Sequence, residues 1–354
     1  MNKVLNFFDR NHAIAWIILA ISIPAILYPR FNMQDIAIVR PFVGVHNGEL
    51  TIDQQNYLHF VQYFRGEVPL DSVHAPYSFR PLIPFTASLM PFSDAMTSIN
   101  LVNTFSVMLT VLLIILTLKK LGYSFGIRIC GALLYVISFP TLYYSTTGHI
   151  DATSTMFLFA IIWARISGED IWLILFFILA ALAKETSIIL FPFLFLHLYF
   201  HNNPSARFTF SSLFKCLKIP AQKENRNIYF IFWIAFILYF VTTIIARKAF
   251  GMFGDGSDYV WFPSAEHLAD NIFRSKTYIS LIISFGFPGL FALLYISKKH
   301  IVKKAVFNAF IIGMCTSLLM WVYSYFSAWA DGRFIWTAYP FMIPLAAEYF
   351  RKRN

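Results

Sequence analysis

Residues 94–117 read DAMTSINLVNTFSVMLTVLLIILT, an apolar run that ends just before Lys119 and Lys120. A helix needs roughly 20 mostly apolar residues to cross the hydrocarbon core of a bilayer. Comparable runs occur along the rest of the chain, at 13–29, 125–144, 152–166, 170–183, 187–201, 228–246, 277–296, 305–326 and 335–350. The sequence therefore predicts an all-α polytopic membrane protein with about ten transmembrane helices.

The overall composition supports this assignment. Of 354 residues, 58% are hydrophobic and only 13% are charged, whereas soluble domains have about 45–50% apolar and about 25% charged residues. The apolar excess lies in long runs, which an ordinary soluble core does not need. We expect a single transmembrane domain over residues 1–354 and no separate soluble domain.

The basic residues predict the orientation of the chain. Lys3 and Arg10 flank the first span, and the positive-inside rule places them in the cytoplasm. The later loops that this orientation puts in the cytoplasm carry Lys119, Lys120, Arg128, Arg165, Arg207, Lys215, Lys218, Lys223, Arg226, Lys298, Lys299, Lys303, Lys304 and the tail Arg351, Lys352, Arg353. We expect both termini to be cytoplasmic and the protein to lie in the cell (inner) membrane. This topology explains the net charge of +10 without a nucleic-acid partner.

The first apolar segment and the three cysteines give two further expectations. Ala13–Tyr28 follows a basic N-terminus and has no small-residue cleavage site, which indicates a retained signal-anchor. Cys130, Cys216 and Cys315 show neither the spacing of a metal site nor a pair typical of an exported disulfide.

Two long loops are predicted on the non-cytoplasmic side, at 30–93 and 247–276, opposite the basic cytoplasmic loop 202–227. Long loops between spans are usually functional or disordered. In the first, Thr51 and Gln54 have the spacing of a capping box. The following apolar residues have helical spacing, and Gly66 and Pro69 end the pattern: Tyr57, Phe60, Val61 and Phe64. This predicts an amphipathic helix lying in the membrane interface.

The same loop supplies two candidate functional residues. Asp53 falls in the first turn of the interfacial helix, where a carboxylate could act as a base or as a metal ligand. Arg80 stands before the segment 81–92, which is too short to span and is predicted to be re-entrant or interfacial. A guanidinium there suits phosphate. The alternatives are that Asp53 only assists capping and that Arg80 only reaches lipid headgroups.

Other ionisable residues are predicted at the same membrane face. Such residues at membrane depth are costly and are functional candidates by default. They are His149, Asp151, Lys184, Glu185, Asp331 and Arg333, with Asp255, Asp258, Glu266 and His267 among Tyr259, Trp261 and Phe262 in the second loop. In the structural alternatives, Lys184 and Glu185 form a self-compensating pair in a hairpin turn, His149 is an interfacial histidine, and Asp331 and Arg333 only punctuate a loop.

Four short motifs resemble the GT-C superfamily of integral-membrane glycosyltransferases, in particular its protein mannosyltransferase and aminoarabinose-transferase branch. Asp53-Gln54-Gln55-Asn56-Tyr57 resembles the D-E-x-x-Y motif, with Gln54 in place of the second acid. Phe79-Arg80-Pro81-Leu82 is similar to a K-P-P-L-like stretch with Arg for Lys, and Ala181–Glu185 to L-A-x-x-T-K. Arg333, Tyr339-Pro340 and Pro344-Leu345 resemble a late-span motif.

This resemblance implies a GT-C-like fold that transfers a sugar from a polyprenyl-phosphate donor to a glycan, lipid or protein acceptor outside the cytoplasm. It implies Asp53 as the catalytic residue and Arg80 with Lys184 as phosphate ligands. The other implied substrate-binding or phosphate-binding residues are Tyr57, His149, Asp151, Glu185, His267 and Arg333. A divalent cation, with Asp53 as a ligand, is left open.

Functions other than sugar transfer also account for part of the distribution of charged residues. A transporter or flippase of lipid-linked saccharides would line a path near the bilayer midplane, often with two related halves; the charges here lie at one end of the spans, and no internal repeat is evident. A polysaccharide polymerase or ligase would use the same lipid-linked substrates and remains an alternative. A structural subunit would not need so many charges at membrane depth.

Overall fold

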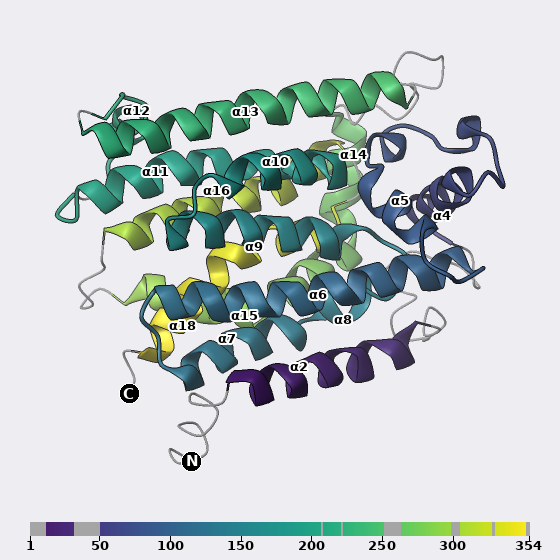
Figure 1. Ribbon diagram of the computed structural model, residues 1–354, viewed down its shortest axis with the longest axis horizontal. Helices are drawn as coiled ribbons and strands as arrows, with labels where there is room; N and C mark the ends of the chain where they lie inside the picture. The colour runs from purple at the N-terminus through teal and green to yellow at the C-terminus, as the bar shows by residue number, and fades with distance from the viewer. Residues whose placement is uncertain are drawn as a thin grey trace.

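The computed structural model describes residues 12–31, 50–206, 208–220, 222–250, 263–298, 305–327 and 330–351. Within these ranges every regular element is a helix, and no strand occurs. The long helices lie side by side along one axis and form a bundle (Figure 1). The expectation of an all-α chain is confirmed for the described residues.

Each predicted apolar run contains a helix of the bundle. These are α2 (His12–Leu27), α6 (Ala95–Lys120), α7 (Phe125–Val136), α9 (Asp151–Ser167), α10 (Trp172–Ala183), α11 (Leu190–Asn202), α13 (Lys223–Ala249), α15 (Ser275–Ser297), α16 (Val306–Ser327) and α18 (Tyr339–Arg351). Along the chain, consecutive long helices run in opposite directions (Figure 1). Among the described helices, α6, α13, α15 and α16 are long and apolar enough to cross a membrane, as expected for an α-helical membrane protein.

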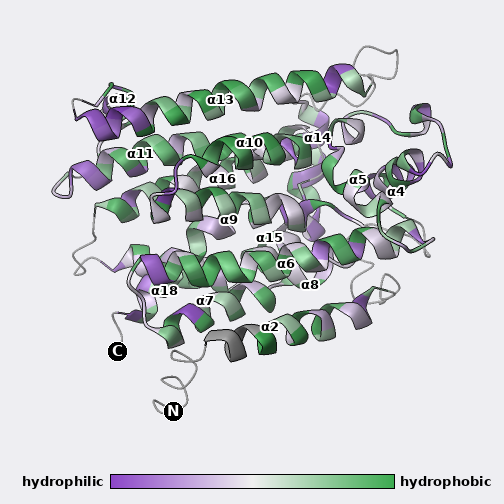
Figure 2. Cartoon of the chain, in the orientation of Figure 1, coloured by the Kyte–Doolittle hydropathy of each residue, from purple (hydrophilic) through white to green (hydrophobic). Residues whose placement is uncertain are grey.

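The bundle has two distinct ends, which we name after the short helices that lie there (Figure 1). The α4 end carries α4 (Ile52–Phe64), η3 (Leu70–Ser72), η4 (Tyr77–Phe79), α5 (Leu82–Ser88), α8 (Phe139–Tyr144), η5 (Glu185–Ile189), α14 (Ala265–Phe273) and α17 (Arg333–Trp336). The α12 end carries α12 (Phe210–Lys215). Hydrophobic residues dominate the helix shafts between the ends (Figure 2). This pattern fits a layer of lipid around the shafts.

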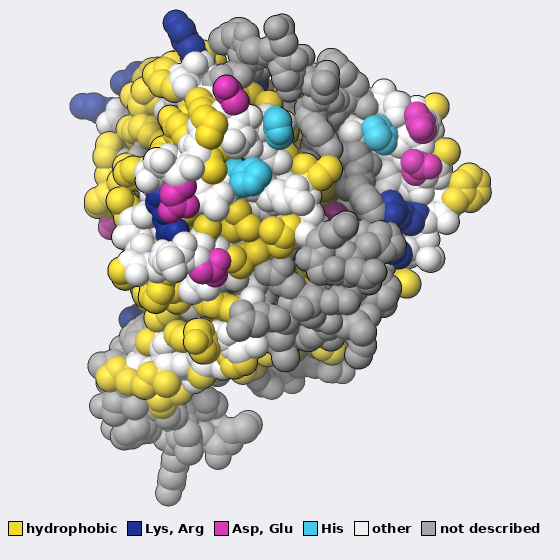
Figure 3. Space-filling view, turned by 90° about the vertical axis from the view of Figure 1, so that its right-hand side faces the viewer, with side chains coloured by type: hydrophobic (Ala, Val, Ile, Leu, Met, Phe, Trp, Pro, Cys, Tyr) yellow, Lys and Arg dark blue, Asp and Glu magenta, His cyan; other side chains and the backbone are white. Residues whose placement is uncertain are grey.

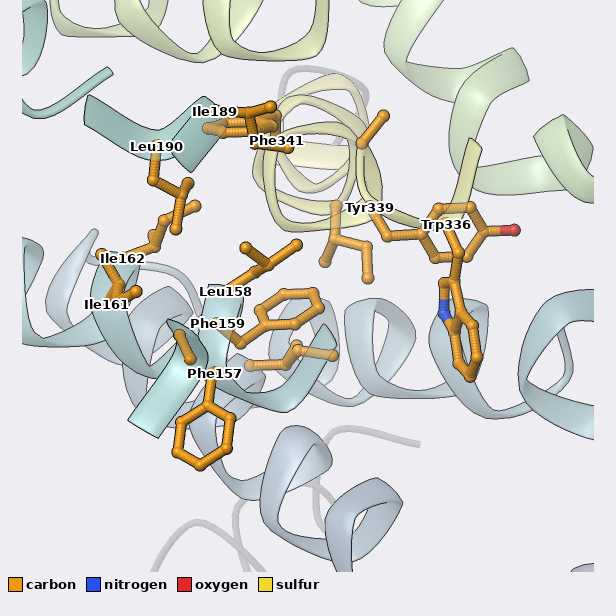
Figure 4. Close-up of a cluster of buried hydrophobic side chains, with 14 of the residues drawn as sticks. Phe157, Leu158, Phe159, Ile161, Ile162, Ile189, Leu190, Trp336, Tyr339 and Phe341 are labelled. Carbon is orange, nitrogen blue, oxygen red and sulfur yellow. The ribbon is translucent and has the colours of Figure 1, made fainter. Parts of the chain in front are cut away.

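The core of the bundle is built around α9, α11 and α18. Trp336 of α17, Tyr339 of α18 and Phe159 of α9 are buried in one cluster of side chains (Figure 4). In contrast, the outer helices α2 and α13 expose large apolar side chains such as Ile21 and Ile244. Exposed apolar surface of this kind is unfavourable in water and marks a surface that contacts lipid or protein.

Three helices depart from simple spans. The predicted run 125–144 is broken between α7 and α8, where Pro140 sits in the first turn of α8; proline fits that position because its missing N–H would be unpaired there anyway. The run 187–201 begins as η5 and continues as α11. Helix α15 kinks at Gly286, which has a left-handed φ of +47° two residues before Pro288.

Two basic residues that the sequence placed in water-facing loops are buried instead. Arg165 donates through Nη1 to both carboxylate oxygens of Asp170 (2.9 and 2.7 Å) and through Nε to Nδ1 of His197 (3.2 Å). Arg128 is buried within α7. Neither charge can therefore be counted as a free cytoplasmic charge. The loop between α9 and α10 is short, so Asp170 lies close enough to neutralise Arg165.

Other basic residues at the α12 end are exposed as expected: Lys119, Lys120, Lys215, Lys218, Lys223 and Arg226. Lys3, Arg10, Arg207, Lys299, Lys303, Lys304, Lys352 and Arg353 lie outside the described residues. The three cysteines are free thiols.

Candidate functional site

Helix α4 forms as the sequence predicts. The Thr51 hydroxyl accepts a hydrogen bond from Gln54 N (3.3 Å), and Thr51 N donates to Gln54 Oε1 (2.7 Å), which completes the capping box. The helix ends at Phe64, and Gly66 follows with a left-handed φ of +74°. Tyr57, Phe60 and Val61 are buried against the bundle.

Asp53 does not serve as the cap of α4. Its Oδ1 accepts a hydrogen bond from the Tyr77 hydroxyl (2.6 Å), and its Oδ2 is ion-paired with Nη1 of Arg333. Tyr77 comes from η4 and Arg333 from α17, 280 residues along the chain. The carboxylate therefore joins the first loop to the last, and the reading of Asp53 as a capping residue alone is wrong.

Arg80 is buried and faces inward. Its Nε donates to Oε2 of Glu185 (2.9 Å), its Nη2 pairs with the other oxygen of the same carboxylate, and its Nη1 donates to the Tyr57 hydroxyl (2.7 Å). Such a two-pronged guanidinium–carboxylate contact fixes orientation as well as charge. Arg80 does not extend to lipid headgroups.

Lys184 and Glu185 are neighbours but have different partners. Lys184 has an extended backbone after α10 and is ion-paired with Asp151 at the start of α9, both side chains being buried. Glu185 turns the other way, toward Arg80. The two residues do not neutralise each other in a hairpin turn. Instead they connect two ion pairs.

The loop of His149 is held by two asparagines of α6. Asn100 donates to Thr146 O (3.0 Å) and accepts from Gly148 N (2.8 Å), while Asn103 donates to His149 O (2.6 Å). The buried imidazole lies within hydrogen-bond distance of the Thr147 hydroxyl (3.0 Å) and packs edge-on against Tyr144. The loop geometry thus places His149 at the head of the helix that carries Asp151.

These contacts join into one network, which we call the charged cluster: Asp53, Tyr57, Tyr77, Arg80, Tyr144, His149, Asp151, Lys184, Glu185, Asp331 and Arg333. The rings of Tyr57 and Tyr77 meet edge-on at 5.4 Å and link the Arg80 pair to the Asp53 pair. On the other side, the Tyr144 hydroxyl donates to Asp331, whose Oδ2 lies 3.9 Å from Nε of Arg333.

Sequence reasoning did not find Tyr77, Tyr144 or Ser280, which complete the network. Ser280 of α15 donates to Asp331 Oδ1 (3.2 Å). Tyr144 and Ser280 lie within apolar spans, where a hydroxyl side chain has no distinctive spacing. Tyr77 could have been found, because it lies in the proline-bounded stretch directly before Arg80.

The charges set the ionisation of the residues in the loops. Burial raises the pKa of the Asp53 carboxyl. Arg333, then His149 and Tyr77, lower this pKa by more than burial raises it, so that it lies well below the usual range. Burial likewise raises the pKa of Glu185, and Arg80 brings it down to about 2. Burial and Arg333 hold the pKa of His149 below its usual value. At neutral pH both carboxyls are anionic and His149 is neutral.

Each cation of the charged cluster has its own carboxylate, and one carboxylate remains. The pairs are Arg80–Glu185, Lys184–Asp151 and Arg333–Asp53, with Asp331 as the additional acid. Exposure is uneven: the side chains of Glu185 and Asp331 are 35% and 22% exposed, whereas those of Arg80 and Lys184 are 6% exposed. Glu185 and Asp331 are therefore the outward-facing carboxylates, whereas the side chain of Asp151 is 8% exposed and nearly as buried as its partner Lys184.

His267 does not join the charged cluster. It lies exposed on α14, as does Glu266, and neither side chain makes a hydrogen bond or ion pair with the described cluster residues. Asp255, Asp258, Tyr259, Trp261 and Phe262 lie outside the described residues. The surface of this end mixes acidic, histidine and apolar side chains (Figure 3).

A divalent cation with Asp53 as a ligand stays a prediction; in this structure Tyr77 and Arg333 each engage one oxygen of the carboxylate. In the described part of the chain, no group of three or more histidine, cysteine, aspartate or glutamate side chains is arranged to hold a metal ion. The cations of the site can bind an anion, and its carboxylates can accept hydrogen bonds from hydroxyl groups.

No protein-family model matches the chain, and no curated protein matches it either.

Proposed function

We propose that the protein is a membrane glycosyltransferase that moves a sugar from a polyprenyl-phosphate donor to a glycan, lipid or protein acceptor. The observation that carries the proposal is the charged cluster itself. Side chains from segments far apart in the chain meet at one end of the bundle, next to apolar helix surfaces. A lipid-linked sugar needs this combination of an apolar path for its tail and polar groups for its head.

The proposal includes a topology. The ten helices α2, α6, α7, α9, α10, α11, α13, α15, α16 and α18 cross the inner membrane in alternate directions. Both termini lie in the cytoplasm, and the α4 end faces the periplasm or exterior. The exposed lysines and arginine at the α12 end support this orientation. In this topology α4 lies in the outer interface, with its buried face toward the bundle.

The cluster residues suggest how transfer occurs. Asp53 accepts the proton of the acceptor hydroxyl as the acceptor oxygen forms a bond to the anomeric carbon. The bond between that carbon and the phosphate oxygen breaks, and its electron pair leaves with the phosphate. Arg80, Lys184 and Arg333 stabilise the negative charge that develops on the leaving group. Tyr77 holds the other oxygen of Asp53 in place.

This mechanism requires a change at one ion pair. While Arg333 is paired with Asp53, it holds the pKa of that carboxyl well below the range of an effective base. The donor phosphate offers Arg333 a second anion. When Arg333 moves to the phosphate, the Asp53 carboxylate loses its strongest counter-ion and becomes more basic. Donor binding would thus activate the base.

The proposal is tested by mass spectrometry of surface glycans and of polyprenyl-phosphate lipids, in cells with the gene, without it, and with the gene restored. We expect deletion to remove a glycosyl group from a surface glycan, lipid or protein and to raise the amount of the polyprenyl-phosphate sugar. Restoring the gene should reverse both changes. Identical glycans and lipid pools in all strains would refute the proposal.

A further inference from the structure

One carboxylate of the charged cluster is held in a different way from the others. Oδ1 of Asp331 receives hydrogen bonds from the Tyr144 hydroxyl of α8, from the Ser280 hydroxyl of α15 (3.2 Å) and from the backbone N of Arg333 (3.2 Å). Among the described residues, Oδ2 has only Nε of Arg333 nearby, at 3.9 Å. One oxygen is therefore fixed by three donors and the other is left with open acceptor positions.

The backbone around Asp331 is docked firmly on its neighbours. Gly332 N donates to the Ser280 hydroxyl (2.8 Å), and Ala330 N donates to Oδ1 of Asn271 on α14 (3.0 Å). A methyl group at position 332 would overlap Ser280 and Ser284 of α15, so this position admits only glycine without movement. The direction in which Oδ2 points is thus set by α8, α14 and α15 together.

The contrast with Asp53 indicates what Asp331 can bind. Both oxygens of Asp53 are occupied, whereas the side chain of Asp331 is 22% exposed and has lone pairs available. A phosphate would be repelled by the carboxylate, and a cation would be disfavoured by the adjacent guanidinium of Arg333. A neutral hydroxyl group meets neither penalty and can donate directly to Oδ2.

We propose that Asp331 is a substrate-binding residue that accepts a hydrogen bond from a sugar hydroxyl, either on the donor glycosyl group or on a glycan acceptor. This assignment rests on the proposed glycosyltransferase function and adds a subsite to it. Tyr144 and Ser280 are positioning residues, because they act through Asp331. The fixed carboxylate favours substrates with a hydroxyl at one defined position, and so contributes to the choice of sugar.

The test uses the full-length protein in proteoliposomes. Its donor is undecaprenyl phosphate carrying the glycosyl group that the glycan comparison identifies, and its acceptor is the glycan, lipid or protein found there. Donor and acceptor concentrations are varied in turn. Asp331→Asn removes the charge and nearly preserves the shape. Tyr144→Phe and Ser280→Ala leave the carboxylate but remove its orienting donors. Asp270→Asn, on exposed α14 at the same end, is the matched control.

We expect Asp331→Asn to raise KM for one substrate by about tenfold to a hundredfold, the loss typical of a hydrogen bond to a charged group. A rise in donor KM assigns the hydroxyl to the donor, and a rise in acceptor KM assigns it to the acceptor. Tyr144→Phe and Ser280→Ala should raise the same KM by less. Asp270→Asn should leave both constants unchanged.

Two results would overturn the assignment in distinguishable ways. If the wild-type protein transfers sugar and Asp331→Asn leaves both KM values unchanged, Asp331 is not a substrate ligand, even if the variant is less stable. If the wild-type protein itself transfers no sugar from any polyprenyl-phosphate donor, the proposed function fails and this subsite fails with it.

Discussion

At the scale of single residues, the candidate site depends on ion pairs and hydrogen bonds between buried side chains. Arg80 makes three hydrogen bonds, two to Glu185 and one to Tyr57, and it does so while buried. A lysine has a single compact ammonium group and cannot reproduce the planar two-pronged contact. The position therefore demands arginine for its geometry as well as for its charge.

The first prediction concerns this residue. Replacing Arg80 with Lys should raise the donor KM by about tenfold or more, because the cation proposed to bind the donor phosphate loses the contacts with Glu185 and Tyr57 that hold it in place. Arg80→Ala should have a larger effect. The acceptor KM should change little in either variant. Steady-state transfer with varied donor measures this, and Arg65→Lys, which links α4 to the loop before α6 at the same end, is the control. An unchanged donor KM in Arg80→Ala would exclude the phosphate role.

The sequence suggested most members of the charged cluster, but not their partners. Asp53, Arg80, His149, Asp151, Lys184, Glu185 and Arg333 stand out because charges are rare in so apolar a chain. Their pairing could not be predicted, since Arg80 and Glu185 are 105 residues apart and Asp53 and Arg333 are 280 apart. Lys184 and Glu185 looked like partners because they are adjacent, yet their side chains diverge. His267 looked equally suitable and lies elsewhere.

At the scale of elements, short helices and loops place the site residues. Gln54 shows how: it completes the capping box of α4, and its Nε2 donates to Thr147 O (2.6 Å) in the loop of His149. The glutamine therefore connects the helix of Asp53 to the loop of His149. The D-E-x-x-Y motif that residues 53–57 resemble has a second acid at this position. An ionised carboxylate there could not donate that hydrogen bond.

The second prediction follows for α4. Gln54→Glu should lower the free energy of unfolding by about 1–3 kcal/mol, because the buried carbonyl of Thr147 loses its donor and meets a carboxylate. Gln55→Glu, one residue further along on the exposed face, should have little effect. Thermal unfolding in detergent compares the two. Equal melting temperatures for Gln54→Glu and wild type would mean that this connection does not stabilise the fold.

The third prediction concerns the contact between α15 and the start of α17. Gly332→Ala should destabilise the protein by about 1–3 kcal/mol, the usual cost of forcing extra volume into a packed site. It should also reduce transfer, because the backbone that carries Asp331 and Arg333 must shift. Removing the Ser284 hydroxyl as well should not restore stability, since the Ser280 carbonyl still blocks the added methyl. A fully stable and active Gly332→Ala would show that this packing is not required.

At the scale of the whole molecule, the arrangement is a helical bundle whose two ends differ. One end gathers the charged cluster, and the other exposes lysines. The helical segments themselves could be predicted, because the length and uniformity of apolar runs depend on sequence alone. The apolar pattern does not locate the break between α7 and α8 or the kink in α15, because packing decides where a proline or glycine interrupts a helix. Burial of Arg165 also required the fold, since its neutralising partner Asp170 reads as an ordinary loop acid.

The fourth prediction tests the orientation of the bundle. In a cysteine-free background, Asp71→Cys at the α4 end should react with a membrane-impermeant maleimide on intact cells. Lys218→Cys at the α12 end should react only after the membrane is opened. Both positions are exposed, whereas His149 is buried and would be a poor reporter. The reverse pattern would place the charged cluster in the cytoplasm.

The central claim is that Asp53 acts in sugar transfer at the charged cluster, and one measurement tests it most directly. Cells that lack the gene are complemented with wild type, Asp53→Asn or Asp94→Asn, and the glycosyl group identified by glycan comparison is quantified by mass spectrometry at equal protein levels in the membrane. Asp94→Asn makes the same chemical change at an exposed helix N-cap, where asparagine also caps well. We predict that wild type and Asp94→Asn restore the glycosyl group and that Asp53→Asn does not. Full restoration by Asp53→Asn would contradict the account.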